Sequence, residues 1–422
     1  MGRMKRSGKG PGWAGVVAPA LVMLACNGGG GESDSGSGTL ATTTGSTATT
    51  TGVTDGGSGS ETGGAIGSCS PDAPVDLEVS GEITSDTTWS GTVRVTANID
   101  VYEGAVLTIL PGTAVVFAVD TDLEIGWNSQ AATIRAEGTA AAPIVLCGAN
   151  PQAGGWRGVS VRPNATSDSV MKFVTIRHAG GGQPALALER GITISDLTIE
   201  ASGDDGVEAI DFAADSANLT VTGATGVPAA LTGAGAVTRF PLGGSLTGNG
   251  DDVVELRFDK IIADTTFRPP GVPYRQTQHV DVYEAAEVVF AAGVAYRFGV
   301  DTDLEIGWND QAATLTVEGT AEAPVVFSGD VAEPGFWRGI TIHSNVTTNS
   351  RISHAEVRDG GGGSAPVLTI LSPISLEHLT LAGNQIGASV ARQGLAATST
   401  DLNITGTKGR PMVIEPMAWT TV

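Results

Sequence analysis

The stretch VLTILPGTAVVF (residues 106–117) decides the fold, because it holds two short apolar runs separated by a Pro-Gly turn. EGTAAAPIVL (137–146) and GGWRGVSV (154–161) follow the same plan. Apolar and polar residues alternate in most such runs, which is the period of a half-buried strand. Thr, Val and Ile dominate the runs, and Gly, Asn, Asp and Pro separate them. We therefore predict an all-β protein, whose best helix candidate is the Ala-rich stretch 388–395.

The spacing of the runs predicts how the strands connect. Selected strand residues recur at similar intervals along copy one: Ile109, Ile134, Val159, Ile176, Ile199 and Val221. This spacing fits a three-sided coil, in which the crossover that parallel strands need is made of further strands. A β-sandwich would instead show hairpin turns such as Asn-Gly between its strands. Asn-Gly occurs only at 27–28 and 249–250.

The chain also repeats itself. DTDLEIGWN (120–128) recurs at 301–309, and DVYE (100–103) recurs at 281–284, both at the same offset. Every position but one of 120–133 is identical in 301–314. We predict a tandem duplication with copy one at 68–249 and copy two at 250–422. The copies could form one continuous rod or two separate ones; apolar residues in the join, among them Phe240 and Leu246, favour one rod.

The quoted segments resemble the right-handed parallel β-helix family of bacterial surface lipoproteins. The resemblance implies that successive segments are rungs of one coil, with the Trp-Arg-Gly turn (156–158) following a variable loop. The predicted fold is therefore a right-handed parallel β-helix, or β-solenoid, built from a tandem duplication. These motifs indicate the architecture specifically, but they say little about function.

The N-terminal residues resemble an export signal. Residues 1–26 hold a basic start, an apolar run and Ala25-Cys26, similar to the lipobox of bacterial lipoproteins. The resemblance implies that Cys26 is lipidated and anchors an exported protein at the bacterial surface or at the periplasmic face of the outer membrane. A plain signal peptide with an incidental cysteine is the alternative. Gly, Ser and Thr make up most of residues 27–67, which predicts a disordered linker.

Charge and cysteine content limit the partners further. The formal charge of −22 argues against nucleic acid, because Lys and Arg dominate phosphate binding. An exported compartment permits disulfides. We therefore favour a bond between Cys69 and Cys147, with two free thiols as the alternative.

The most repetitive segment supplies the candidate site. Alternation places Val119, Thr121, Leu123 and Ile125 inward, so that the carboxylates of one segment share an outward face. This face is either a solvated acidic surface or a cation or glycan site with two tryptophans as stacking surfaces. The cation could be Ca²⁺. Because Ca²⁺ takes six to eight oxygen ligands, an adjacent rung would have to supply further oxygens. The candidate residues are Asp120, Asp122, Glu124 and Trp127 in copy one and Asp301, Asp303, Glu305 and Trp308 in copy two.

Evidence for catalysis is weak in the sequence. The five histidines have no histidine at the partner position in the other copy, and Gly-x-Ser-x-Gly, HExxH and Gly-His-Gly motifs are missing. Trp156-Arg157 and Trp337-Arg338 could stack on sugars, but a structural role is more common for such pairs. We predict a non-catalytic binding or structural protein of the cell envelope, with a glycan, a cation or an envelope protein as partner. A polysaccharide lyase or glycoside hydrolase on the same scaffold is the alternative.

Overall fold

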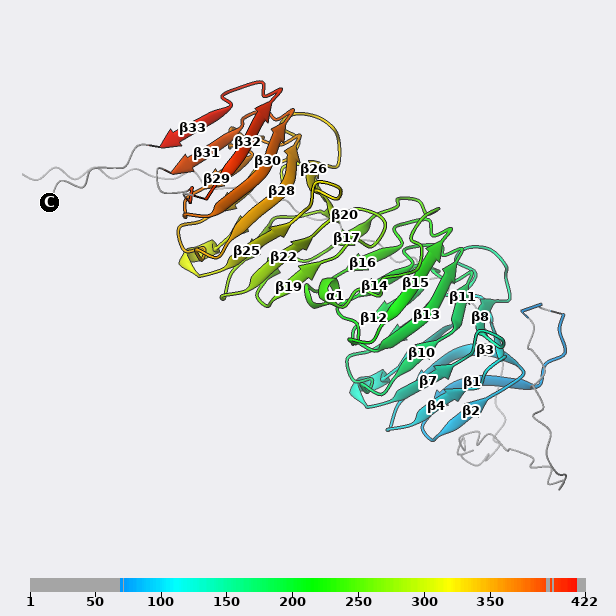
Figure 1. Cartoon of the computed structure of the whole chain (residues 1–422). Coiled ribbons are helices and arrows are strands. Elements are labelled where there is room, and N and C mark those ends of the chain that lie inside the picture. The colour runs from blue at the N-terminus through cyan, green and yellow to red at the C-terminus, as the bar shows by residue number, and fades with distance from the viewer. Residues whose placement is uncertain (1–68, 71, 392–394, 397, 416–422) are drawn as a thin grey trace, which may run out of the picture. The chain divides into compact units, whose positions relative to one another are not determined.

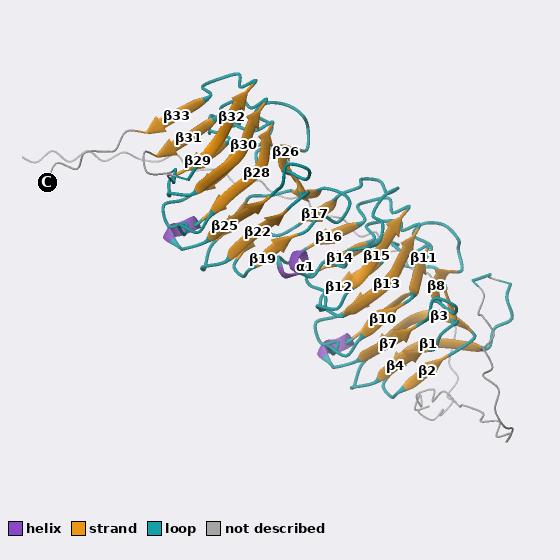
Figure 2. Ribbon diagram, viewed as in Figure 1, coloured by secondary structure: helices purple, strands orange, loops and turns teal. Residues whose placement is uncertain are grey.

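The computed structural model describes residues 69–70, 72–391, 395–396 and 398–415. The predicted signal segment 1–26, with Cys26, and the linker 27–67 lie outside these residues. All described residues belong to one compact unit, Thr62–Val422. Its short parallel strands stack rung upon rung with almost no helix (Figures 1 and 2). This architecture confirms the predicted right-handed parallel β-helix. The helices of the described part are too short to cross a membrane.

The strands form four parallel ladders. Copy one begins the first ladder with β1 (Leu77–Ile83), β3 (Thr92–Val101), β5 (Ala114–Phe117), β8 (Ile144–Gly148), β11 (Val174–Arg177), β13 (Thr193–Glu200) and β15 (Ala217–Thr222). The second ladder leaves the end of β3 and runs through β6 (Asp122–Ile125), β9 (Gly158–Val161), β12 (Leu186–Leu188), β14 (Val207–Ala209), β16 (Ala229–Leu231), β17 (Val254–Leu256), β20 (Tyr274–Gln276), β23 (Ala295–Phe298) and β26 (Val325–Gly329).

The third ladder comprises β2 (Thr87–Trp89), β4 (Val106–Ile109), β7 (Thr133–Glu137) and β10 (Val170–Lys172) in copy one and β19 (Thr265–Phe267), β22 (Glu287–Ala291) and β25 (Thr314–Glu318) in copy two. Three longer strands near the C-terminus follow: β28 (Arg351–Arg358), β30 (Ser375–Ala382) and β32 (Thr400–Thr405). The fourth ladder is a separate seven-stranded sheet of β18 (Lys260–Ile261), β21 (Val280–Val282), β24 (Asp303–Ile306), β27 (Gly339–Ile342), β29 (Leu368–Ile370), β31 (Ala388–Ala391) and β33 (Met412–Glu415).

The predicted helix at 388–395 is wrong over its first half, where β31 pairs with β29 and β33. Ala388 and Val390 are buried, so the local alternation and the neighbouring rungs override the helix propensity of alanine. Helical turns occur instead at α1 (Gly235–Thr238), η1 (Trp127–Ser129) and η2 (Trp308–Asp310).

The second ladder continues without a break through the join between the copies. Beyond the join, however, it is built from strands that correspond in sequence to a different ladder of copy one. Ala230 of β16 pairs with Glu255 of β17, which pairs with Arg275 of β20. The second ladder therefore passes from β6 into β23, although β23 corresponds in sequence to β5. The counterpart of β6 is β24, which lies in the separate sheet. The two copies of the DTDLEIGWN segment consequently lie on different ladders.

The two Trp-Arg-Gly turns hold buried tryptophans. Trp156 and Trp337 are fully buried, and their rings stack on Phe117 and Phe298 at centroid distances of 3.9 and 3.8 Å. Each indole Nε1 donates a 2.8 Å hydrogen bond to a backbone carbonyl, at Arg177 for Trp156. The structural interpretation of these tryptophans therefore agrees with the contacts, and sugar stacking on them is excluded by burial.

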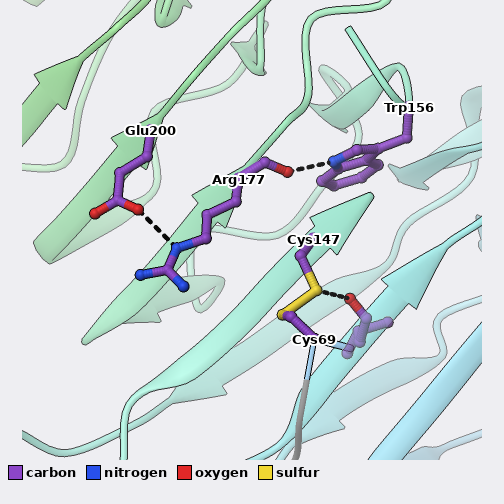
Figure 3. Close-up of a disulfide and its surroundings, with 6 residues drawn as sticks. Cys69, Cys147, Trp156, Arg177 and Glu200 are labelled. Carbon is purple, nitrogen blue, oxygen red and sulfur yellow. Dashed lines mark hydrogen bonds and ion pairs between the residues drawn. A yellow bond between two sulfur atoms is a disulfide. The ribbon is translucent and has the colours of Figure 1, made fainter. Parts of the chain in front are cut away.

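A disulfide fastens the start of the described chain to the coil. Cys69 bonds to Cys147 of β8, beside Trp156 (Figure 3). Arg177, whose carbonyl accepts the Trp156 hydrogen bond, pairs with Glu200 at 2.6 Å on the next rung. The two cysteines are separated by 78 positions in the sequence, and closing a loop of that length contributes about 4 kcal/mol in the chain-entropy estimate.

Replacing Trp337 tests the structural assignment. Trp337→Ala leaves a cavity against Phe298 and removes the hydrogen bond to Arg358, so we expect a loss of about 3–5 kcal/mol in unfolding free energy. Denaturant unfolding followed by circular dichroism measures this loss. Trp308→Ala, at a side chain 42% exposed, is the control and should change stability by less than about 1 kcal/mol. Equal losses in the two variants would contradict the assignment.

Candidate functional site

The repeated DTDLEIGWN segment builds the same outward-facing feature twice. The strands β6 and β24 are followed directly by Gly126 and Gly307, whose φ angles of 85° and 81° favour glycine. A Cβ on Gly126 would lie 2.6 Å from the backbone nitrogen of Ala165. The following short helical turn exposes its tryptophan, with 41% of Trp127 and 42% of Trp308 accessible. These rings are therefore free to stack on a ligand, in contrast to the buried tryptophans.

The structure corrects the predicted row of three carboxylates. Asp120 and Asp301 precede the strands and have φ angles of 60° and 57°, so they lie in exposed turns. Val119, predicted to point inward, is 56% exposed for the same reason, whereas Leu123 and Ile125 are buried as predicted. Strand alternation begins only at the first residue of the strand. Each copy thus keeps two carboxylates on the strand, at Asp122 and Glu124 or at Asp303 and Glu305.

A neighbouring rung supplies the third carboxylate of each copy. Asp100 of β3 pairs with Glu124, and Asp281 of β21 pairs with Glu305. In-register parallel strands place such residues about 4.8 Å apart, on the same face. Sequence reasoning missed both residues, although their recurrence in the DVYE motif could have drawn attention to them.

In copy one, arginines from the next rung cover the carboxylates. Arg162 Nη2 lies 2.6 Å from Glu124 Oε1, and its Nη1 lies 2.6 Å from Glu189 Oε1. Arg157 Nη1 lies 3.6 Å from Asp122 Oδ2. The side chains of Asp122 and Glu124 are only 4% and 9% exposed. Burial and the nearby Glu124 raise the pKa of Asp122, and Arg157 opposes this rise. The acidic cluster of copy one is therefore covered and partly neutralised by Arg157 and Arg162.

In copy two, a histidine replaces the bridging arginine. Residue 343 corresponds to Arg162, and His343 Nε2 lies 2.8 Å from Glu305 Oε2. His279 Nδ1 lies 2.6 Å from Asp303 Oδ1, while the Arg338 guanidinium is 3.9 Å from the same carboxylate. The Asp303 and Glu305 side chains are 15% and 22% exposed, more than their counterparts in copy one. These histidine pairs were not predicted, because neither His279 nor His343 has a histidine at the corresponding position of copy one.

Asp281 titrates unusually in this environment. Burial, and next the negative charges of Glu305 and Asp303, raise the pKa of Asp281 to about 6, and His279 opposes this rise. This carboxyl therefore titrates closer to neutral pH than an ordinary aspartate does, beside Glu305 on the adjacent strand.

A groove lies over this part of copy two. It has a volume of about 570 Å³ and is lined by Lys260, Asp281, Tyr283, Trp308 and Asn309, among others. A second groove of about 530 Å³ begins at Asp259 and Lys260, which line both, and continues over Gly233 and Gly235 at the join. Of the candidate residues of copy two, Trp308 lines this run of accessible surface.

The described side chains do not form a group of ligands suited to a calcium ion. Within the described ranges, no three His, Cys, Asp or Glu side chains are grouped as a metal would require. The strand carboxylates of both copies are instead engaged by arginine or histidine, so the hypothesis of a Ca²⁺ site gains no support from these contacts.

Replacing Asp281 tests the electrostatics of the site. Because its folded-state pKa is raised, the folded protein holds this proton more tightly than the unfolded chain, and stability falls as pH rises from about 4 to 6. Asp281→Asn removes this loss, so we expect a higher Tm than wild type at pH 8 and an equal Tm at pH 4. Thermal unfolding at both pH values measures the difference. A lower Tm at pH 8 would contradict the assignment.

Comparisons with known proteins identify the scaffold only. Residues 81–180, within copy one, match the family model described as a pectate-lyase-like β-helix domain. Neither the comparison with curated proteins nor that with solved structures gave a match. The matched segment covers the first rungs of the coil, and its description agrees with the parallel ladders of the structure: this part of the chain is similar to the β-helix domains of the pectate-lyase type.

Proposed function

We propose that the chain is a carbohydrate-binding protein whose ligand lies in the groove beside Trp308. The observation that carries this proposal is the combination of an exposed indole ring with Tyr283, Asn309 and carboxylates along one groove. Aromatic faces pack against the apolar face of a sugar ring, and carboxylates and amides bond its hydroxyl groups. The binding role is non-catalytic.

The length of the groove supports an oligosaccharide over a single sugar. β18, β21 and β24 are consecutive rungs. The groove runs from Lys260 of β18 past Asp281 of β21 to Trp308 in the turn after β24, and the second groove begins at Lys260. Rungs lie about 4.8 Å apart, so the span is close to the length of two or three pyranose units.

A pair of variants tests the binding site. Trp308→Ala removes the stacking surface of the groove, and we expect about tenfold weaker binding of the best oligosaccharide from a glycan array, or ~1.4 kcal/mol. Trp127→Ala is the matched control, since its ring has nearly the same exposure beside a cluster closed by arginine, and it should bind as wild type does. Calorimetry measures both affinities. Equal loss in both variants, or an array without a bound glycan, would contradict the proposal.

A carbohydrate-active enzyme is the second candidate, favoured by one observation. Asp281, with its raised pKa, neighbours Glu305 on the adjacent strand, and glycosidases use a protonated and an ionised carboxyl group in this way. Release of reducing ends from the bound oligosaccharide, abolished by Asp281→Asn, would replace the binding proposal with this one.

We also propose that the protein is exported and held at the bacterial envelope by a lipid on Cys26. The basic and apolar residues before Cys26 support export, and the disulfide between Cys69 and Cys147 suits an oxidising compartment. The Gly-, Ser- and Thr-rich residues 27–67 would then hold the β-helix away from the membrane.

Replacing the lipidated residue tests the anchor. Cys26→Ser removes the thiol that would carry the lipid, so we expect the protein to move from the membrane fraction to the soluble fraction of fractionated cells. Cys69→Ser is the control for loss of a cysteine and should stay with the membrane. If the Cys26→Ser variant remains in the membrane fraction, the proposal of a lipid anchor on Cys26 is wrong.

A further inference from the structure

We infer that the groove of copy two selects carbohydrates bearing free amino groups, such as a glucosamine oligomer, over neutral, N-acetylated or acidic ones. This inference rests on the proposed carbohydrate-binding function and names its ligand class. It begins from a difference between the two copies of the same feature.

Copy one contains its own cation at the equivalent position. The guanidinium of Arg162 lies between Glu124 and Glu189, 2.6 Å from an oxygen of each. These are charge-assisted contacts between a side-chain cation and carboxylates of two rungs. The acidic cluster of this fold thus has a defined place for a positively charged donor.

Copy two lacks that cation at this position. His343 stands in the place of Arg162 and contacts Glu305, and Leu371 stands in the place of Glu189. Arginine is always charged, whereas imidazole is the side chain whose charge changes around neutral pH, so copy two has no permanent cation at this position. The Glu305 side chain is 22% exposed, against 9% for Glu124, so it is more accessible to a donor from solvent.

The charges around the groove favour a cationic ligand. Asp259 and Asp281 line the groove, and Asp303 and Glu305 act electrostatically on Asp281. Among the described residues, Lys260 and His279 lie in the groove on the positive side, and His279 contacts Asp303 at 2.6 Å. Arg338 lies 3.9 Å from Asp303. The remaining negative charge repels uronate or phosphate groups and attracts ammonium groups.

The aromatic side of the groove places the sugar ring near that charge. Trp308 contacts the edge of His343, with ring centroids 5.9 Å apart. A pyranose stacked on Trp308 would therefore lie close to His343 and Glu305, the counterparts of Arg162 and Glu124 in copy one. An amino group there replaces the missing guanidinium, whereas an acetylated nitrogen carries no charge and needs more space.

The test compares three oligomers of equal length and two substitutions at one position. Calorimetry on the full chain should show at least tenfold tighter binding of the glucosamine oligomer than of the N-acetylglucosamine or galacturonate oligomer. His343→Arg restores the internal cation, so it should weaken glucosamine binding at least tenfold. His343→Gln keeps a neutral hydrogen-bonding side chain and should bind within about twofold of wild type. Circular dichroism melting confirms that both variants fold.

The outcomes distinguish the preference for amino groups from carbohydrate binding itself. Equal affinity for the acetylated and free-amine oligomers overturns the amine preference and leaves carbohydrate binding in place. No measurable binding of any oligomer overturns both. Glucosamine binding that neither Trp308→Ala nor His343→Arg weakens is unspecific attraction to an acidic surface, and it likewise overturns the inference.

Discussion

In-register hydrogen bonding between parallel strands of successive rungs is the constraint on which the rest of the structure depends. It stacks every outward side chain on those of the rungs before and after it, whatever the length of the loops between them. Asp281 and Glu305 are distant in the sequence and lie side by side for this reason. The same pairing buries an alternating set of Val, Ile and Leu residues along the axis of the coil, each contributing about 1.5–3 kcal/mol.

The two copies show how one scaffold can hold a closed and an open version of the same cluster. The strand, the left-handed glycine and the exposed tryptophan are the same in both, so the local backbone does not distinguish the two copies. The difference comes from side chains on neighbouring rungs. Arg162 bridges Glu124 and Glu189 in copy one. In copy two, His343 contacts Glu305 and His279 contacts Asp303. Because the ladders shift at the join, the two clusters lie on different ladders.

Much of the fold could be predicted because residues close together in the sequence determine it. The alternation at Leu123 and Ile125 and the repeat at a constant offset are visible in the sequence, and the alternation is confirmed by burial of both side chains. The chosen strand positions came from different sides of the coil, since Ile134 lies on β7, Val159 on β9 and Ile199 on β13. The site was harder to predict, because contacts such as His343 with Glu305 join residues on different rungs. Which rung meets which depends on loop lengths that strand periodicity does not report.

The most direct measurement of the central claim is a disulfide crosslink between neighbouring rungs of the fourth ladder. The double variant Asp281→Cys with Glu305→Cys places two thiols on directly paired positions, and the account predicts that they oxidise to a disulfide in the folded protein. Asp281→Cys with Thr341→Cys places them two rungs, about 9.6 Å, apart and should stay reduced, since bridging needs Cα atoms within about 7 Å. Crosslinking of the second pair but not the first would contradict the ladder described here.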